Sequence, residues 1–263
     1  MNNLLTDICN RKKKEIEALK LKCSLKSLQK LIGNKQNREF KKIVKESQKN
    51  EKNNIIAEIK QSSPSAGEII KDYYPEDIAV KYEKAGAGAI SILTEKNFFK
   101  GSIDHLSIIE TKTNIPILRK DFIIDPYQIY ESKVYKADSI LLIMSILEDN
   151  EINEYIKIAN DIGLDCIIEA HSRDEINRAI KIDYPIIGIN NRNLDNLSVN
   201  INNTLDMINQ IPKNFTVIGE SGIKSNENIK KYNDHGVYNF LIGETILRSS
   251  NYDSMIKKLL KKW

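Results

Sequence analysis

The feature that most constrains the fold of this chain is a series of short apolar segments, each followed by a segment with helical periodicity. Continuous apolar runs of this length are typical of parallel strands buried on both faces, whereas a half-exposed antiparallel sheet shows strict alternation. Eight such strands alternating with helices predict an α/β fold, a (β/α)8 TIM barrel. The predicted strands are Ile55–Ile59, Ala89–Leu93, Ile115–Leu118, Ser139–Ile143, Cys166–Glu169, Ile186–Ile189, Phe215–Ile218 and Phe240–Ile242.

The helical segments carry recognisable start and stop signals. Asp125-Pro126 combines a capping side chain with proline at the first helical position, and Gly86 and Gly163 follow the ends of two others. An open doubly wound sheet is the alternative, but no GxGxxG turn follows an early strand. The predicted helices are Pro75–Lys84, Ile103–Thr111, Pro126–Val134, Glu148–Ile162, Arg173–Ile180, Asn203–Ile211, Asn226–Tyr232 and Ser254–Lys261.

The chain before the first strand is predicted to be helical. Residues 4–32 suggest two helices and Glu39–Ser47 a third, with too little apolar surface to fold alone. The length of 263 residues is near that of one barrel. We therefore expect a single domain, residues 1–263, in which residues 1–50 form an N-terminal helical extension packed on the barrel.

Charge and composition exclude several classes of protein. The net charge is +4, and basic residues are concentrated in residues 1–52, where Phe40 is the one aromatic residue. Base stacking is therefore poorly supported, and we expect a solvated surface with no nucleic-acid partner. No apolar run approaches the ~18 residues of a membrane helix, and no secretory signal is present. A cytoplasmic protein without a membrane partner is expected, as a monomer rather than an oligomer.

Cysteine and histidine give no sign of a metal or cofactor. The three cysteines are odd in number and far apart, so we interpret them as reduced structural thiols. His105, His171 and His235 lack the spacing of metal ligands. His171 closely follows Glu169, but we interpret it as a loop histidine outside the site.

Charged and polar residues collect where the predicted strands end. The third strand is followed by Arg119, Lys120 and Asp121, and Glu58 and Lys60 flank Ile59 and so point the same way. One such charge is often only a solvated loop residue. Charged and polar residues at five strand ends favour a shared site, because the carboxyl ends of barrel strands form one rim. Burial and mutual charge there would perturb their pKa values. The candidates are Glu58, Lys60, Lys120, Glu169, Asn190 and Glu220.

A phosphate site is the second signal. Ser221-Gly222 and Gly243-Glu244 follow the last two strands, the usual place of a barrel phosphate site made by backbone N–H groups. Either pair alone would be explained by an ordinary tight turn. Ser63 and Arg192 would add a hydroxyl and a cation.

These residues lie in segments that resemble the indole-3-glycerol phosphate synthase family of tryptophan biosynthesis. The resemblance runs from about residue 4 to the C-terminus. The matching segments are Ile56–Ser65, Ser91–Ser102, Leu118–Glu131, Gly188–Leu194, Gly219–Ile223 and Ile242–Glu244.

The resemblance implies an activity. The family closes the ring of 1-(2-carboxyphenylamino)-1-deoxyribulose 5-phosphate, a small phosphosugar, with loss of CO₂ and water and without metal or cofactor. Lys120 is the family's candidate for the acid that activates the ribulose carbonyl. Lys60 and Glu169 match the acid and base discussed for loss of the hydroxyl. Which of the two lysines protonates which oxygen stays open.

The resemblance also implies binding roles. Glu58 matches a residue that orients Lys60, and Glu220 and Asn190 match polar groups that hold the intermediate. Ser63 or a nearby lysine would meet the anthranilate carboxylate. The aromatic ring would contact Phe99, Leu118, Phe122, Leu141 and Leu194, and the phosphate side would use Arg192, Ser221, Gly222, Gly243 and Glu244.

Other functions are less consistent with these residues. Phosphoribosylanthranilate isomerase, another phosphosugar barrel, would need a Cys/Asp pair, whereas the first strand carries Glu58 and Lys60. From a different class, the chain could be an inactive phosphate binder or an RNA binder with a basic arm. The intact set of charged strand ends argues against the first, and the scarcity of aromatic residues in the arm argues against the second.

Overall fold

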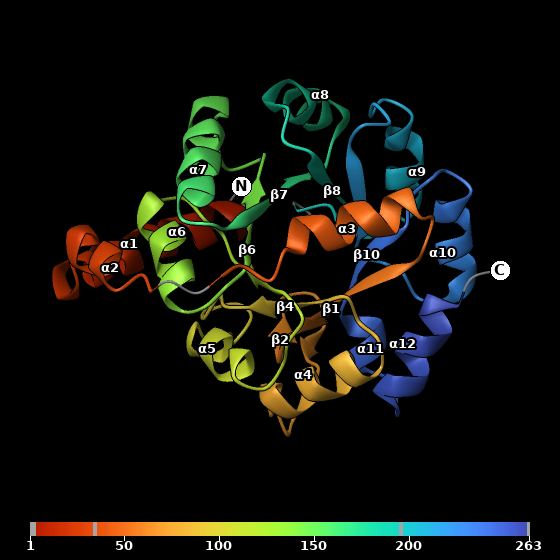
Figure 1. The fold of residues 1–263 in the computed structure, drawn as a ribbon, viewed down its shortest axis with the longest axis horizontal. Helices are drawn as coiled ribbons and strands as arrows, with labels where there is room; N and C mark the ends of the chain where they lie inside the picture. Colours follow the sequence, from red (N-terminus) through yellow and green to blue (C-terminus); the bar gives the residue numbers. More distant parts are fainter. Residues whose placement is uncertain (1–3, 34–35, 195–196, 262–263) are drawn as a thin grey trace.

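The structure, a computed structural model, describes residues 4–33, 36–194 and 197–261. Within them, parallel strands form a closed barrel in the order β1-β10-β9-β8-β7-β6-β5-β4, and helices surround it (Figure 1). The (β/α)8 barrel predicted from the apolar pattern is confirmed. The barrel strands are β1 (Asn54–Ile59), β4 (Ala89–Leu93), β5 (Ile117–Lys120), β6 (Ser139–Ile143), β7 (Asp165–Ala170), β8 (Ile186–Asn190), β9 (Thr216–Glu220) and β10 (Asn239–Ile242).

Two of the outer helices begin at side-chain caps, the first of which the sequence indicated. The Asp125 side chain accepts a hydrogen bond from the Tyr127 N–H at the start of α6, and Ser172 caps α8 through the Glu175 N–H. The helices after β1 are α4 (Pro75–Lys84), α5 (Asp104–Glu110), α6 (Pro126–Val134), α7 (Asp149–Asp161), α8 (Arg173–Ile182), α9 (Asn202–Ile208), α10 (Asn226–Asn233), α11 (Glu244–Leu247) and α12 (Tyr252–Leu260).

Four strands, β5, β7, β8 and β9, extend one or two residues further toward the mouth of the barrel than the apolar runs predicted. Lys120 is the last residue of β5 and is in register with Leu93, and Asn190 is in register with Glu220. The third strand begins at Ile117 and not at Ile115. Backbone pairing is indifferent to side-chain polarity, so it continues under the polar residues. Their side chains are therefore fixed by the ladder of the sheet and not by loops.

Three short elements were not predicted. β2 (Ser62–Ser63) and β3 (Gly67–Glu68) form a small antiparallel hairpin in the loop after β1. The four-residue helix α11 follows β10 directly. Each is too short for a periodic pattern to be recognised in the sequence.

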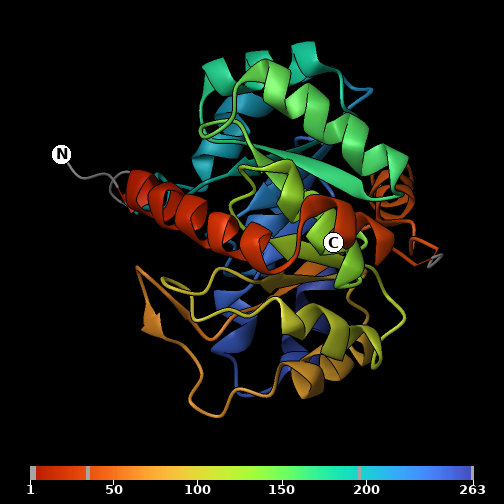
Figure 2. The same cartoon turned by 90° about the vertical axis from the view of Figure 1, so that its left-hand side faces the viewer.

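The N-terminal helices contact both ends of the barrel. α3 (Phe40–Lys49) covers the ends where strands begin, since the Asn239 side chain donates to the Val44 carbonyl. α1 (Leu4–Lys22) crosses the molecule in Figure 2, and its Lys12 ammonium lies 3.0 Å from the Asp121 carboxylate just after β5. α2 (Leu25–Lys30) packs on α6.

The core is continuous from the barrel to the surrounding helices. All residues of β1, β4, β6, β7, β8, β9 and β10 are buried, as expected for parallel strands covered on the outside by helices. Among the described residues, no helix has both the length and the apolar character needed to cross a bilayer.

Candidate active site

A cavity of about 140 Å³ opens at the carboxyl end of the barrel. Strand-end side chains that are far apart in the sequence line it together, as the rim argument predicted. All six candidate catalytic residues belong to its lining: Glu58, Lys60, Lys120, Glu169, Asn190 and Glu220.

Lys120 lies between two carboxylates at the centre of this cavity. Its Nζ is 3.1 Å from Glu169 Oε2 and 3.2 Å from Glu220 Oε2. The side chains of Glu169 and Glu220 are only 3% and 1% exposed. Two carboxylates thus share one ammonium out of contact with bulk water.

The pKa values of Lys120, Glu169 and Glu220 are all shifted, and those of the two carboxyl groups shift in opposite directions. Burial opposes the charge of Lys120, but Glu169 and Glu220 outweigh it, so its pKa lies above the ordinary value. Burial also opposes the charge of Glu169, yet Lys120 and His171 lower its pKa. The pKa of Glu220 is raised by burial and by the neighbouring Glu169 charge, against the effect of Lys120. Two carboxyl groups with opposite shifts are suited to different acid–base roles.

Glu58 and Lys60 form a second pair on β1 and the loop after it. The Lys60 ammonium donates a short hydrogen bond to the Glu58 carboxylate, and both side chains are largely buried. Gly243 makes room for this pair, since a Cβ there would lie 2.3 Å from Glu58 Oε1. Gly188 does the same for Glu220, whose Oε1 would lie 2.3 Å from an added Cβ.

Most of the predicted ring and phosphate residues line the same cavity. Phe99 and Phe122 lie side by side, with ring centroids 6.3 Å apart. The Arg192 guanidinium donates to Ser65 Oγ of the hairpin and to the Leu197 carbonyl, both at 3.0 Å. The predicted residues that line the cavity are Phe99, Phe122, Leu141, Arg192, Leu194, Ser221, Gly222, Gly243 and Glu244.

Two predicted binding residues lie outside this lining. Leu118 is fully buried on β5, two residues before Lys120 and on the same face, which places it one layer deeper in the barrel. Ser63 lines a neighbouring cavity of about 80 Å³, which shares Lys60, Phe99 and Arg192 with the first. Its hydroxyl accepts a hydrogen bond from the Ala66 N–H of the hairpin.

His171 lies in the loop after β7 and outside the cavity lining, as expected, but it contacts a residue of the site. Its Nε2 lies 3.2 Å from Glu169 Oε1 and its side chain is 10% exposed. The physical reason is strand parity: residues two apart on an extended chain point the same way, and His171 is two residues after Glu169. That spacing was the signal that could have identified it.

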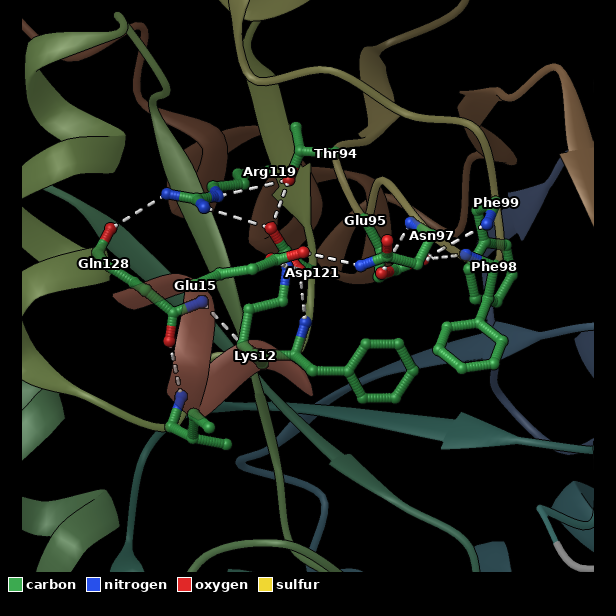
Figure 3. A network of polar contacts seen from close by, with 12 residues as sticks. Lys12, Glu15, Thr94, Glu95, Asn97, Phe98, Phe99, Arg119, Asp121 and Gln128 are labelled. Carbon is green, nitrogen blue, oxygen red and sulfur yellow. Dashed lines mark hydrogen bonds and ion pairs between the residues drawn. The ribbon is translucent and has the colours of Figure 1, made fainter. Parts of the chain in front are cut away.

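Arg119 and Asp121, on either side of Lys120, belong to a second polar network (Figure 3), although Asp121 also contributes to the lining of the catalytic cavity. Arg119 contacts the carboxylates of Asp121 and Glu131 at 3.0 and 2.9 Å. Asp121 also receives the Thr94 hydroxyl at 2.6 Å and the Lys12 ammonium at 3.0 Å. Lys12 and Arg119 also line a larger cavity of about 500 Å³ on this outer side, between α1, the loop after β4 and α6.

No metal site accompanies either cluster in the part of the chain that the structure describes. There, no three or more His, Cys, Asp or Glu side chains come together in a way that could hold an ion.

The chain is similar to known proteins along its whole length. Residues 5–259 match the family model described as indole-3-glycerol phosphate synthase. The indole-3-glycerol phosphate synthase of Legionella pneumophila (strain Paris) is 39% identical over 260 residues, which cover 99% of each chain. That of Lachnoclostridium phytofermentans is 45% identical over 206 residues, 78% of this chain and 76% of the relative.

Solved structures show the fold alone. KGPDC from Streptococcus mutans superposes with a TM-score of 0.59 at 14% identity, covering 79% of this chain and 95% of that one. The family model and the two relatives are far more specific. The chain belongs to the indole-3-glycerol phosphate synthase family.

Proposed function

We propose that this chain closes the ring of 1-(2-carboxyphenylamino)-1-deoxyribulose 5-phosphate, with loss of CO₂ and water, to give indole-3-glycerol phosphate. The observation that supports this most is the position of Lys120. It is a charged acid held between Glu169 and Glu220 in a cavity at the barrel mouth of a family member.

In the proposed first step, the ring carbon that bears the carboxylate attacks the ribulose carbonyl carbon. Lys120 donates a proton to the carbonyl oxygen, which becomes a hydroxyl. CO₂ then leaves, and its bonding electron pair restores the aromatic ring. Lys120 is protonated near neutral pH, since the two carboxylates raise its pKa.

In the proposed second step, the new hydroxyl leaves as water. An acid protonates it while a base removes a proton from the neighbouring CH₂, which forms the double bond of the indole. We assign these roles to Lys60 and Glu169. Glu169 is suited to be the base because its lowered pKa keeps it anionic. Glu58 contacts the Lys60 ammonium and would orient it.

The remaining residues would bind the substrate. Asn190 and Glu220 would hold the intermediate, and Ser63 or a nearby lysine would meet the anthranilate carboxylate. The ring would lie against Phe99, Phe122, Leu141 and Leu194, with Leu118 supporting this layer from below. Arg192 and the backbone N–H groups at Ser221, Gly222, Gly243 and Glu244 would bind the phosphate.

The test is to add the purified chain to the carboxyphenylamino-deoxyribulose phosphate and to follow indole fluorescence. We expect fluorescence to rise with release of one CO₂ per indole formed, and no turnover of phosphoribosylanthranilate, the isomerase substrate. Failure to form indole, or isomerisation of the second compound, would refute the proposal.

We further propose that residues 1–263 act as a single domain with residues 1–50 as its helical extension. A cytoplasmic monomer without nucleic-acid or membrane partners is the expectation for such a biosynthetic enzyme. The oligomeric state is tested by light scattering of the purified chain.

A further inference from the structure

Glu169 and Glu220 offer two carboxylates to one ammonium at almost equal distances, 3.1 and 3.2 Å. Lys120 alone therefore does not decide which of them carries the negative charge. Two like charges in one buried site cannot both ionise easily, so one carboxyl group is driven toward its protonated form. A second, asymmetric contact is needed to make the choice.

His171 supplies that asymmetry. Its Nε2 lies 3.2 Å from Glu169 Oε1, the oxygen that does not face Lys120, and its Nδ1 lies 3.5 Å from Glu175 Oε2. The corresponding oxygen of Glu220, Oε1, is buried and has neither an ion-pair nor a hydrogen-bond partner among the residues described, whereas His171 Nε2 contacts Glu169 as an ion pair without hydrogen-bond geometry. Glu169 thus has a cationic group on each oxygen, whereas Glu220 has one in all.

We propose that His171 is a positioning residue that assigns the negative charge of the carboxylate pair to Glu169 and so prepares Glu169 to act as the base. The proposal rests on the proposed function, in which Glu169 removes the proton from the CH₂ group. His171 is not part of the described lining of the catalytic cavity and acts only through Glu169.

The electrostatics of the surrounding groups agree with this assignment. The titratable groups that face His171 are Glu169 at the end of β7 and Glu175 on α8, and they raise its pKa to about 9, against burial. Lys120 on β5 and Glu220 on β9 lie behind Glu169. His171 is therefore cationic at neutral pH, the pKa of Glu169 is lowered, and that of Glu220 is raised.

The first experiment compares His171→Leu with His171→Gln in the full-length chain. Leucine removes both the charge and the N–H donor, so we expect kcat to fall at least ~10-fold, the scale of a misplaced catalytic group. KM should change by less than about threefold, because His171 does not line the cavity. Glutamine keeps a donor but not the charge, so it should recover only part of kcat. The control is His235→Leu, an exposed histidine on the loop after α10, which should behave as wild type.

The pH dependence of kcat distinguishes the proposed role of His171 from a merely structural one, which would leave this dependence unchanged. Without the cation the pKa of Glu169 rises, so the acid limb of the kcat profile of His171→Leu should move to higher pH. His235→Leu should keep the wild-type limb.

A double-mutant cycle with Glu220→Gln tests the choice between the two carboxylates directly. The Glu220→Gln side chain cannot ionise, so Glu169 no longer competes with residue 220 for the negative charge. Adding His171→Leu to Glu220→Gln should therefore lower kcat by a much smaller factor than His171→Leu does in the wild type. If each substitution lowered kcat by the same factor in the presence and absence of the other, the proposal would be overturned. An unchanged kcat in His171→Leu, equal losses in the Leu and Gln variants, or a loss that follows unfolding alone would also overturn it. A wild-type chain that forms no indole would instead refute the proposed function.

Discussion

Consecutive residues of β5 enter two charge clusters that differ in composition and in consequence. Lys120 points into the barrel, where it faces two carboxylates that compete for it. Arg119 points outward, where it contacts Asp121 and Glu131, and Asp121 in turn contacts Lys12. Outside, the charges of these four buried side chains balance and each has a partner, while Glu15, which is one-third exposed, also contacts Lys12. Inside, Lys60 and Lys120 face the three carboxyl groups of Glu58, Glu169 and Glu220, so one carboxyl group has no lysine of its own.

The difference teaches how one strand can serve stability and chemistry at the same time. A balanced buried network with its hydrogen bonds satisfied holds elements together but has little freedom to exchange protons. In an unbalanced one, a carboxyl group without a cation of its own is driven toward its protonated form, so it can exchange a proton near neutral pH, as acid–base catalysis requires. We therefore expect inward substitutions to change rates and outward ones to change the free energy of unfolding.

The largest effect should come from Lys120→Met. Removing the proposed acid should lower kcat at least ~10³-fold. Binding of indole-3-glycerol phosphate should persist, because the phosphate and ring residues are unchanged. Steady-state kinetics and titration with the product measure the two effects separately. Near-normal turnover by Lys120→Met would show that Lys120 is not the acid, and the inner and outer clusters would then not differ in function as proposed.

Arg119→Met should act in the opposite way. It leaves Asp121 and Glu131 buried without their shared cation, so we expect the free energy of unfolding to fall by at least ~3 kcal/mol. The kcat of the molecules that remain folded should stay within about tenfold of the wild type. Urea unfolding and active-site titration provide the measurements. A stable but inactive variant would mean that the outer network belongs to the chemistry.

Asp121→Asn should also lower the free energy of unfolding, by a smaller amount than Arg119→Met and in a way that depends on pH. Lys12, Arg119 and the Thr94 hydroxyl lower the pKa of Asp121 to about 2, although burial opposes this. A carboxyl group with a lowered folded-state pKa stabilises the fold above its unfolded value and loses this effect as the pH falls through the folded value.

The free energy of unfolding of the wild type should therefore exceed that of Asp121→Asn by about 2 kcal/mol at pH 7. This difference should disappear between about pH 4 and pH 2. Urea unfolding at several pH values measures it. A gap that is constant with pH would show that the charge of Asp121 is not what stabilises the network.

The sequence predicted the barrel and the charged rim because both depend on local patterns. Apolar runs mark buried strands, and Glu58, Lys120, Glu169 and Glu220 stand where those runs end. Arg119, Lys120 and Asp121 were expected to form one group because they follow the same predicted strand. Strand alternation would have placed the outer two on the opposite face, as it would have placed His171 beside Glu169.

Other features were beyond local patterns. Lys12 comes from α1, more than a hundred residues before its partner Asp121, and nothing in its surroundings distinguishes it from the neighbouring lysines. The position of Ser63 depends on a hairpin whose strands are two residues long. Contacts of this kind are set by tertiary packing, which a single sequence does not encode in any short window.

The central claim is that the inner side of β5 is where the substrate reacts. A crystal structure of the chain with bound indole-3-glycerol phosphate tests it most directly. We predict the indole against Phe99 and Phe122 within reach of Lys120, with the phosphate at Ser221–Gly222 and Gly243–Glu244. Product bound instead in the larger outer cavity, beside Lys12 and Arg119, would contradict it.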